Sequence, residues 1–152
     1  MGFIITPAIK LIFRKNNMKK YELTNEVIHY NGGTLYRIKA LIDFGNVKAG
    51  DLGGYVQSED NLSHEGNCWV GNDAWVYDDA QVLEDAKVFD CAKVFGDAKV
   101  FGCAMVFDNA WVFETAEVFK NAKIFGNAEV LGRVRVFGDA EVCGQATVSS
   151  NE

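Results

Sequence analysis

The sequence predicts an all-β fold of short, stacked strands, and two regular columns of residues predict it. Valine or isoleucine recurs at every sixth position from Val70 to Val148 without a gap. Two positions before each of them stands a small residue, alanine or Cys68, and only Val134 is larger. Because residues two apart on a strand face the same side, both columns are expected to point into a common core. A period of six does not match a helix.

The residues between these columns predict tight corners. Gly-Asp stands at 96 and 97, Asp-Asn at 108 and 109, and Gly-Asn at 126 and 127. Glycine, asparagine and aspartate tolerate the positive φ that tight turns require. Each six-residue unit is therefore expected to be a short strand followed by a corner.

The unit A-x-V-x-G-[DN] resembles the hexapeptide repeat of left-handed parallel β-helix proteins over residues 68–148. The resemblance implies that three units close one triangular coil, and that the coil is left-handed, against the usual right-handed crossover. Counting from Val56 gives about five coils and a β-helix over residues 56–148. In this frame Val56 and Leu62 occupy the small-residue column, while Ser58 and His64 occupy the valine column.

Residues 18–55 are expected to form an N-terminal β-hairpin cap. Asn31-Gly32 lies between two apolar-rich runs in EVIHYNGGTLYRIKALI, which is a hairpin signal. A β-helix exposes unpaired backbone at each end, and this segment is predicted to cover the first coil. Residues 149–152 are a polar tail with no comparable cap, so we expect an open edge there to which a second copy could pair.

Residues 1–17 do not resemble the rest of the chain. Their apolar run is broken by Pro7 and Lys10 and is too short to span a bilayer. We interpret the segment as a leader or an upstream extension, with Met18 as the natural start. The alternative is an interfacial anchor, through which the chain would contact a membrane.

Charge is divided unevenly along the chain. Residues 1–55 carry eight Lys or Arg against four Asp or Glu, a net charge of +4. Residues 56–152 carry seven against seventeen, a net charge of −10. The acidic repeats argue against direct binding to nucleic acid or to an anionic membrane, and they favour a partner that is neutral, basic or a protein.

The cysteines and histidines do not predict a metal site. Cys68, Cys91, Cys103 and Cys143 show no C-x-x-C spacing and have no histidine at ligand spacing. We expect reduced thiols in a cytoplasmic protein, with no metal and no cofactor.

Aromatic residues directly after the inward valines are expected to stack on all three faces of the prism. Residues eighteen apart fall into one column, because three units make a coil. The columns are Tyr77, Phe95 and Phe113 on the first face, Phe89, Phe107 and Phe125 on the second, and Phe101, Phe119 and Phe137 on the third. A binding site would hardly repeat on every face, so these ladders are predicted to be structural.

The residues directly before the valines differ from face to face and favour the first face as an interaction surface. There, Lys93 would lie between Trp75 and Trp111, within reach of both ring faces. The six residues of this candidate interface, for a protein partner or a second copy of the chain, are Trp75, Tyr77, Lys93, Phe95, Trp111 and Phe113. The alternative interpretation is an aromatic stack that only stabilises the fold.

Acidic residues gather at the corners of the early coils. They are Asp73, Asp78, Asp79, Glu84, Asp85, Asp90 and Asp97. Turn chemistry and solubility are one explanation. A negative surface that imitates nucleic acid toward a basic protein groove is another, and calcium binding is a third.

Many hexapeptide β-helix proteins are acyltransferases, and the resemblance implies a histidine base beside a loop that interrupts the coils. This sequence offers only His29 and His64, and the repeats of residues 68–148 run without an insertion. A general base needs a pocket as well as a proton acceptor, and an unbroken prism predicts none. We therefore lean against an enzyme and name no catalytic residue.

A closer resemblance is to uncharacterised bacterial and prophage hexapeptide proteins, labelled putative transferases or polymer-forming proteins. The segments that carry it are KKYEL, DFGNVKAGDLGGYV and NLSHEGNCWV, followed by VFGDA-type repeats. It implies no chemistry. Our leading hypothesis is a non-catalytic interaction or self-assembling scaffold module. The alternatives are a phage-type inhibitor of a basic host defence or nucleic-acid enzyme, and an acyl-CoA-dependent acyltransferase.

Overall fold

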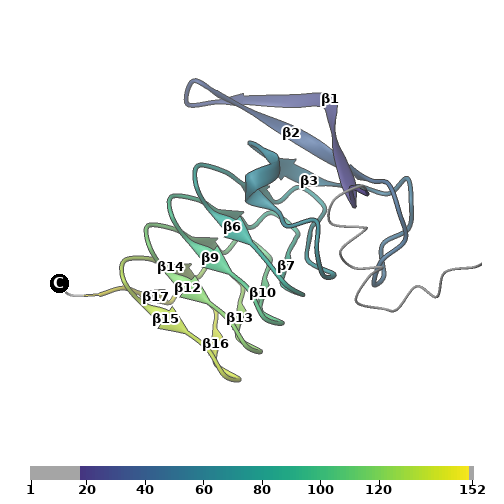
Figure 1. The fold of residues 1–152 in the computed structure, drawn as a ribbon. Helices are drawn as coiled ribbons and strands as arrows, with labels where there is room; N and C mark the ends of the chain where they lie inside the picture. Colours follow the sequence, from purple (N-terminus) through teal and green to yellow (C-terminus); the bar gives the residue numbers. More distant parts are fainter. Residues whose placement is uncertain (1–17, 151–152) are drawn as a thin grey trace, which may run out of the picture.

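The computed structural model of the chain describes residues 18–150, and they form the predicted all-β, left-handed parallel β-helix of about five coils. Figure 1 shows the coils stacked one behind the other, with a long hairpin at the N-terminal end of the stack. The predictions for residues 1–17, a leader or upstream extension before Met18 or an interfacial anchor, lie outside the described residues. In the part that is described, no helix has the length and apolarity needed to cross a bilayer.

Three longer strands precede the coils: β1 (Tyr21–Tyr30), β2 (Gly33–Ala40) and β3 (Leu52–Val56). A short 3₁₀ helix, η1 (Glu59–Asn61), comes after them. The coils consist of two-residue strands: β4 (Trp69–Val70), β5 (Trp75–Val76), β6 (Gln81–Val82), β7 (Lys87–Val88), β8 (Lys93–Val94), β9 (Lys99–Val100), β10 (Met105–Val106), β11 (Trp111–Val112), β12 (Glu117–Val118), β13 (Lys123–Ile124), β14 (Glu129–Val130), β15 (Arg135–Val136), β16 (Glu141–Val142) and β17 (Thr147–Val148).

The two-residue strands pair in parallel into three sheets, one for each face of the prism, and β1, β2 and β3 extend the first of these sheets. The first sheet has the order β1-β2-β3-β5-β8-β11-β14-β17, the second β16-β13-β10-β7-β4, and the third β15-β12-β9-β6. Within each sheet the valines stand opposite one another, as Val76 does with Val94 and Val94 with Val112. The alanine and valine columns are fully buried from Ala74 to Val130, so the predicted core is confirmed.

The corners have the predicted turn chemistry. The residue two positions after each inward valine or isoleucine, from Asn72 to Gly144, has a positive φ. At one corner the side chains also link successive coils: the Asp108 N–H donates to Asp90 Oδ2 at 3.2 Å, and the Gly126 N–H donates to Asp108 Oδ2 at 2.9 Å. Aspartate at this position therefore satisfies backbone donors of the next coil as well as forming the turn.

The first coil departs from the predicted frame by two residues. Val56 pairs with Val76, and Leu62 forms a parallel bridge to Val82, so both stand in the valine column and not in the small-residue column. The offset arises because a fixed period of six does not hold through residues 63–67, where the chain makes a wider turn with Gly66 at φ +69°. As a result His64 does not occupy a core position; it packs against the cap.

The hairpin cap forms as predicted. Its turn has Asn31 at φ 49° and Gly32 at φ 77°, the left-handed conformations that an Asn-Gly hairpin turn requires. β2 pairs antiparallel with β3, and β3 pairs parallel with β5, so the hairpin continues the first sheet. Tyr21, Ile38 and Phe44 are buried in the same core as the first coils. At the other end of the described coils, Ala140 and Ala146 are exposed.

Candidate functional site

A groove of about 450 Å³ lies between the hairpin tip and the outer surface of the first sheet, and we call it the aromatic groove. Its volume is in the range of sites that hold small molecules or single side chains. It is lined by Tyr30, Asn31, Gly33, Leu35, Gln57, Tyr77, Asp78, Lys93, Phe95, Trp111 and Phe113. Five of the six residues predicted as an interface line it, and the sixth, Trp75, contacts Tyr30 and Lys93.

Lys93 lies between the two tryptophans, as its column predicts. The strand register places Trp75 opposite Lys93 and Lys93 opposite Trp111. The Lys93 Nζ atom is 4.2 Å from the Trp75 ring centroid and 5.5 Å from that of Trp111. Both distances are short enough for a cation–π contact. The predicted geometry is thus confirmed, whereas the role of these residues as an interface stays a prediction.

The floor of the groove is one of the aromatic ladders. Tyr77 stacks on Phe95 with centroids 5.0 Å apart, and Phe95 stacks on Phe113 at 4.8 Å, with the rings parallel to within 5°. Ladders of the same spacing stand on the other two sheets, for example Phe89 on Phe107 at 5.0 Å. Because the stacking repeats on every face, it stabilises the prism; the hairpin is what makes the first face different.

The hairpin wall was not predicted as part of the site. The Tyr30 ring meets Trp75 edge to face at 5.1 Å and Tyr77 at 5.7 Å, and Lys93 Nζ lies 6.0 Å from it. Burial raises the pKa of Tyr77, and the charge and hydrogen bond of the Tyr30 hydroxyl raise it further. Because Tyr30 directly precedes the Asn31-Gly32 turn, its position at the hairpin tip could be predicted from the sequence. The sequence did not indicate which face of the β-helix the tip would cover.

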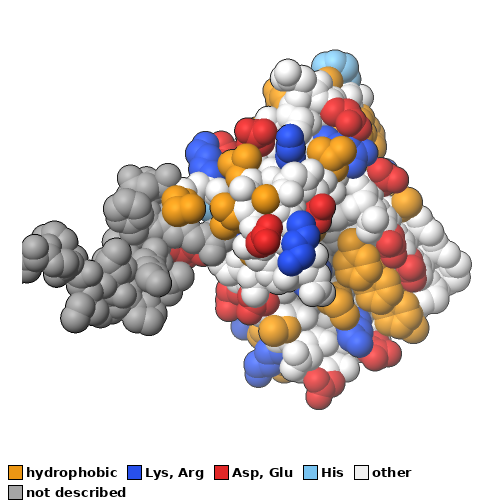
Figure 2. Space-filling model, turned by 90° about the vertical axis from the view of Figure 1, so that its right-hand side faces the viewer, with side chains coloured by type: hydrophobic (Ala, Val, Ile, Leu, Met, Phe, Trp, Pro, Cys, Tyr) orange, Lys and Arg blue, Asp and Glu red, His pale blue; other side chains and the backbone are white. Residues whose placement is uncertain are grey.

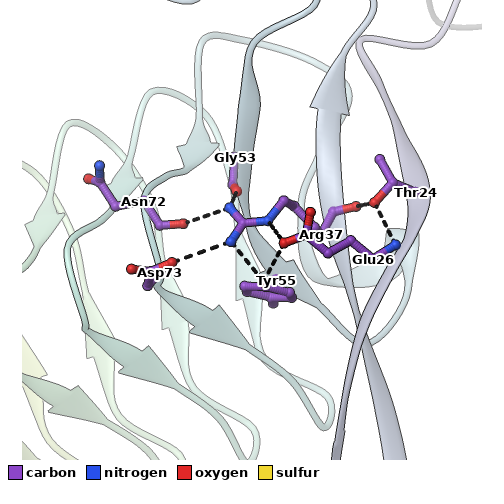
Figure 3. A network of polar contacts seen from close by, with 7 residues as sticks. All are labelled: Thr24, Glu26, Arg37, Gly53, Tyr55, Asn72 and Asp73. Atoms are coloured by element: carbon purple, nitrogen blue, oxygen red, sulfur yellow. Dashed lines mark hydrogen bonds and ion pairs between the residues drawn. The ribbon is translucent and has the colours of Figure 1, made fainter.

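Arg37 of β2 holds the hairpin over the coils (Figure 3). Its guanidinium donates to Glu26 Oε2 at 2.7 Å, to the Gly53 carbonyl at 2.7 Å and to the Tyr55 hydroxyl at 2.7 Å. It also lies over the Tyr55 ring, with Cζ 4.4 Å from the centroid. The network therefore joins all three strands of the hairpin region.

The same guanidinium reaches the first corner of the β-helix. It donates to the Asn72 carbonyl at 3.3 Å and pairs with Asp73 Oδ1 at 3.4 Å. The hydrogen bond from Arg37 is the main reason that the pKa of Glu26 is lowered. The Arg37 side chain is only 15% exposed, so these contacts are partly shielded from water. The network fixes the angle between hairpin and coils, and hence the shape of the aromatic groove.

A second polar cluster, at the base of the cap, accounts for His64. Its ring stacks on Tyr21 with centroids 4.2 Å apart. The Lys20 backbone N–H donates to His64 Nδ1 at 3.1 Å, so Nδ1 has no proton and Nε2 donates to Glu59 Oε1 at 2.7 Å. Both ring nitrogens are therefore used in holding the cap, and His64 does not line the aromatic groove.

His29 lies near the hairpin tip, where its Nδ1 atom is 3.3 Å from the Thr34 hydroxyl. It too is not among the residues of the groove. Neither histidine of the chain therefore lies in the groove that would hold a substrate.

The predicted acidic cluster is spread over three corners. Asp73 and Asp90 come after strands of the second sheet, Asp78, Asp79 and Asp97 after strands of the first, and Glu84 and Asp85 after β6 of the third. Several of their carboxylates make structural contacts: Asp73 with Arg37, and Asp78 Oδ2 with the Gly96 N–H at 3.2 Å. Their role toward a basic partner stays a prediction. Among residues 18–150, no group of three or more His, Cys, Asp or Glu is arranged to hold a metal ion.

A second groove, also of about 450 Å³, lies on the second sheet beside the 41–51 loop. Lys87 and Trp69 stand opposite each other there, in the same relation as Lys93 and Trp75. Trp69, however, packs under the cap, with its ring 5.2 Å from Phe44. No cation–π contact of Lys87 is found within the described residues. Among residues 18–150, Lys93 is the lysine that lies between two tryptophan rings, one half-buried and the other exposed.

The fold and the groove define a left-handed β-helix protein with an aromatic recess under an N-terminal hairpin. The chain is 39% identical over 61 residues to the "Uncharacterized acetyltransferase YdcK" of Escherichia coli (strain K12). The match covers 35% of this chain and 19% of that protein, so the chain spans about a fifth of that relative. No protein-family model matches the chain.

Proposed function

We propose that this chain is a non-catalytic protein-interaction module, and that the aromatic groove holds a segment of the partner. The observation that supports this most directly is the Lys93 ammonium between Trp75 and Trp111 in a concave, aromatic-lined recess. In the described part of the chain, the other two sheets carry aromatic ladders but no lysine between two tryptophans.

Tryptophan, tyrosine and arginine dominate the binding energy of protein interfaces when they lie in recessed, well-packed positions. Trp111 is 39% exposed and Tyr30 37% exposed, although both are large aromatic side chains. A ligand segment inserted between them would bury this surface at about 25 cal/mol per Å² of apolar area. Burying these exposed rings under a ligand would therefore make a favourable contribution to the free energy of binding.

The proposal is tested by comparing two variants on adjacent faces. Trp111→Ala removes one wall of the groove, and Met105→Ala changes the equivalent position one strand earlier, on the second sheet. A partner captured on the immobilised wild-type chain, identified and then purified, should bind Trp111→Ala at least about tenfold more weakly and bind Met105→Ala unchanged. Light scattering of the three proteins distinguishes a second copy of the chain from a different partner.

Equal binding to wild type and Trp111→Ala would overturn the proposal. Salt-sensitive binding that survives Trp111→Ala but is lost when Asp78, Asp79 and Asp97 are neutralised would instead support the acidic corners as the binding surface.

Acyl transfer is the second candidate function, favoured by the 61-residue match to a protein named as an acetyltransferase. The positions of His29 and His64 argue against it, since both rings lie outside the groove and His64 is held by Lys20 and Glu59. An acyl-CoA that binds with a dissociation constant of about 10 μM should stabilise the chain by about 2.7 kcal/mol at 1 mM. A melting temperature that stays unchanged with millimolar acetyl-CoA would remove this candidate.

A further inference from the structure

We propose that the partner segment held in the aromatic groove carries one carboxylate beside a large apolar side chain. The inference rests on the proposed function and names the chemistry that the groove would recognise. Lys93 supplies the anion site, and the aromatic walls supply the apolar site.

The Lys93 ammonium has donors that no residue from 18 to 150 uses. It contacts the faces of Trp75 and Trp111, and it makes no hydrogen bond or ion pair with any residue from 18 to 150. An ammonium group has three N–H donors. Partial removal from water makes such a donor favour a charged acceptor, and charge-assisted hydrogen bonds are about twice as strong as neutral ones. A carboxylate entering the groove would meet these donors directly.

The charges around the groove limit the ligand to a single carboxylate. Lys93 and Asp78 are the two charged residues among those that line it. Asp78 is bound to the Gly96 N–H at 3.2 Å, and its own N–H donates to Gln57 Oε1 at 2.7 Å. The repeats around it carry a net charge of −10 over residues 56–152. A run of acidic residues would be repelled by this field, whereas one carboxylate placed on Lys93 is paired locally.

The remaining walls are suited to an apolar side chain. Besides its two charged residues, the groove is lined by the apolar side chains of Leu35, Phe95, Phe113 and Trp111 and by the ring of Tyr30. Its volume of about 450 Å³ accommodates a large side chain together with the neighbouring carboxylate-bearing residue. On the side of the molecule that faces the viewer, Figure 2 shows hydrophobic patches with acidic and basic side chains beside them. Because the groove itself is lined mainly by apolar and aromatic residues and the repeats are acidic, it favours a segment that is mainly apolar and carries one charge.

The proposed ligand chemistry is tested with three capped tetrapeptides: Ac-Gly-Phe-Glu-Gly-NH₂, its Phe-Gln counterpart and its Ala-Glu counterpart. Each peptide is titrated against the full chain, and binding is measured by tryptophan fluorescence and calorimetry. We expect the Phe-Glu peptide to bind about tenfold more tightly than either of the others, since each loses one of the two recognised groups. Lys93→Met should abolish the preference for Glu over Gln, and Lys93→Arg should retain it. Lys87→Met, the matched change in the second groove, should leave all three affinities unchanged.

Absence of binding by the Phe-Glu peptide, equal binding of the Phe-Glu and Phe-Gln peptides, or a preference that survives Lys93→Met would each overturn the inference. Loss of the preference in Lys87→Met but not in Lys93→Met would place the site in the second groove and overturn it as well. The proposed function is judged separately, because it depends on whether a whole partner or a second copy distinguishes Trp111→Ala from Met105→Ala. If Trp111→Ala weakens partner binding and Met105→Ala does not, but the peptides show no preference for Phe-Glu, the aromatic groove is the binding surface and the proposed ligand chemistry is wrong.

Discussion

The aromatic ladder on the second sheet makes a quantitative prediction about Phe107, which stands in the middle of it. Its ring stacks on Phe89 and on Phe125, with centroids 5.0 Å apart in both cases and interplanar angles of 4° and 3°. Each aromatic pair contributes about 0.5–1.5 kcal/mol beyond its buried area. Phe107→Leu keeps an apolar side chain of similar burial but removes both stacks, so the free energy of unfolding should fall by about 1–3 kcal/mol.

Phe137 provides the matched control, because it ends its ladder and has one ring partner in the described residues, Phe119 at 5.3 Å and 16°. It is also 51% exposed. Phe137→Leu should therefore cost less than about 1 kcal/mol. Urea unfolding followed by circular dichroism measures both variants, and a double-mutant cycle of Phe107 with Phe125 isolates one stack, with an expected coupling of about 0.5–1.5 kcal/mol. A coupling near zero, or equal costs at Phe107 and Phe137, would refute the structural role assigned to the ladders.

Three further predictions concern the corners, the hairpin and the cap. Lys120 has φ 56°, so Lys120→Gly should relieve left-handed strain of about 1–2 kcal/mol at an entropic cost of about 0.5–1 and raise the melting temperature. Asn121, the next residue, has no positive φ, so Asn121→Gly should lower the stability of the protein. Equal losses of stability in Lys120→Gly and Asn121→Gly would contradict the reasoning. Arg37→Met should lower the free energy of unfolding by about 1–3 kcal/mol and speed amide exchange in β1 and β2. The control Arg135→Met, at a side chain that is 69% exposed, should lower the free energy of unfolding by less than about 1 kcal/mol. Unchanged amide exchange in β1 and β2 of Arg37→Met would show that Arg37 does not hold the hairpin. Partial burial raises the pKa of Glu59, but hydrogen bonds from His64 and Lys19 outweigh it and bring the pKa below its ordinary value of 4.5. A carboxylate with a lowered folded pKa stabilises the fold above its unfolded pKa, and this stability is lost as the pH falls through the folded value. Glu59→Gln should therefore be less stable than wild type at neutral pH and lose less stability on acidification below about pH 4.5, and parallel acid-unfolding curves would argue against the contribution.

The repeats could be predicted almost residue by residue because each position has one physical task. Val106 and Ala104 are buried, and so are the residues that align with them in the neighbouring coils. Asp108 has a positive φ and forms the corner. The column rule by itself places Lys93 between Trp75 and Trp111, where the structure has it. Local patterns of this kind suffice where each coil contacts only its neighbours.

The cap and the groove required tertiary information. A fixed period carried back past Cys68 misplaces Val56 and Leu62, because nothing in the pattern marks the two additional residues of the first coil. The Asn31-Gly32 turn predicts a hairpin but not the face of the β-helix that its tip meets, where Tyr30 contacts Trp75. The role of Arg37 is equally hidden in the sequence, since its partners lie between 11 and 36 residues away. One wall of the site was therefore predictable and the other was not.

The two walls of the aromatic groove belong to one continuous eight-stranded sheet, in which β2, β3 and β5 are hydrogen-bonded neighbours. Widening the groove would require breaking the pairing of β3 with β5 or the contacts of Arg37. A recess built in this way is preorganised: its side chains lose little conformational entropy when a ligand enters, and it has little capacity to adapt to a ligand of the wrong shape. Differences in affinity between ligands should then appear mainly in dissociation rates, with association rates nearly constant across a series.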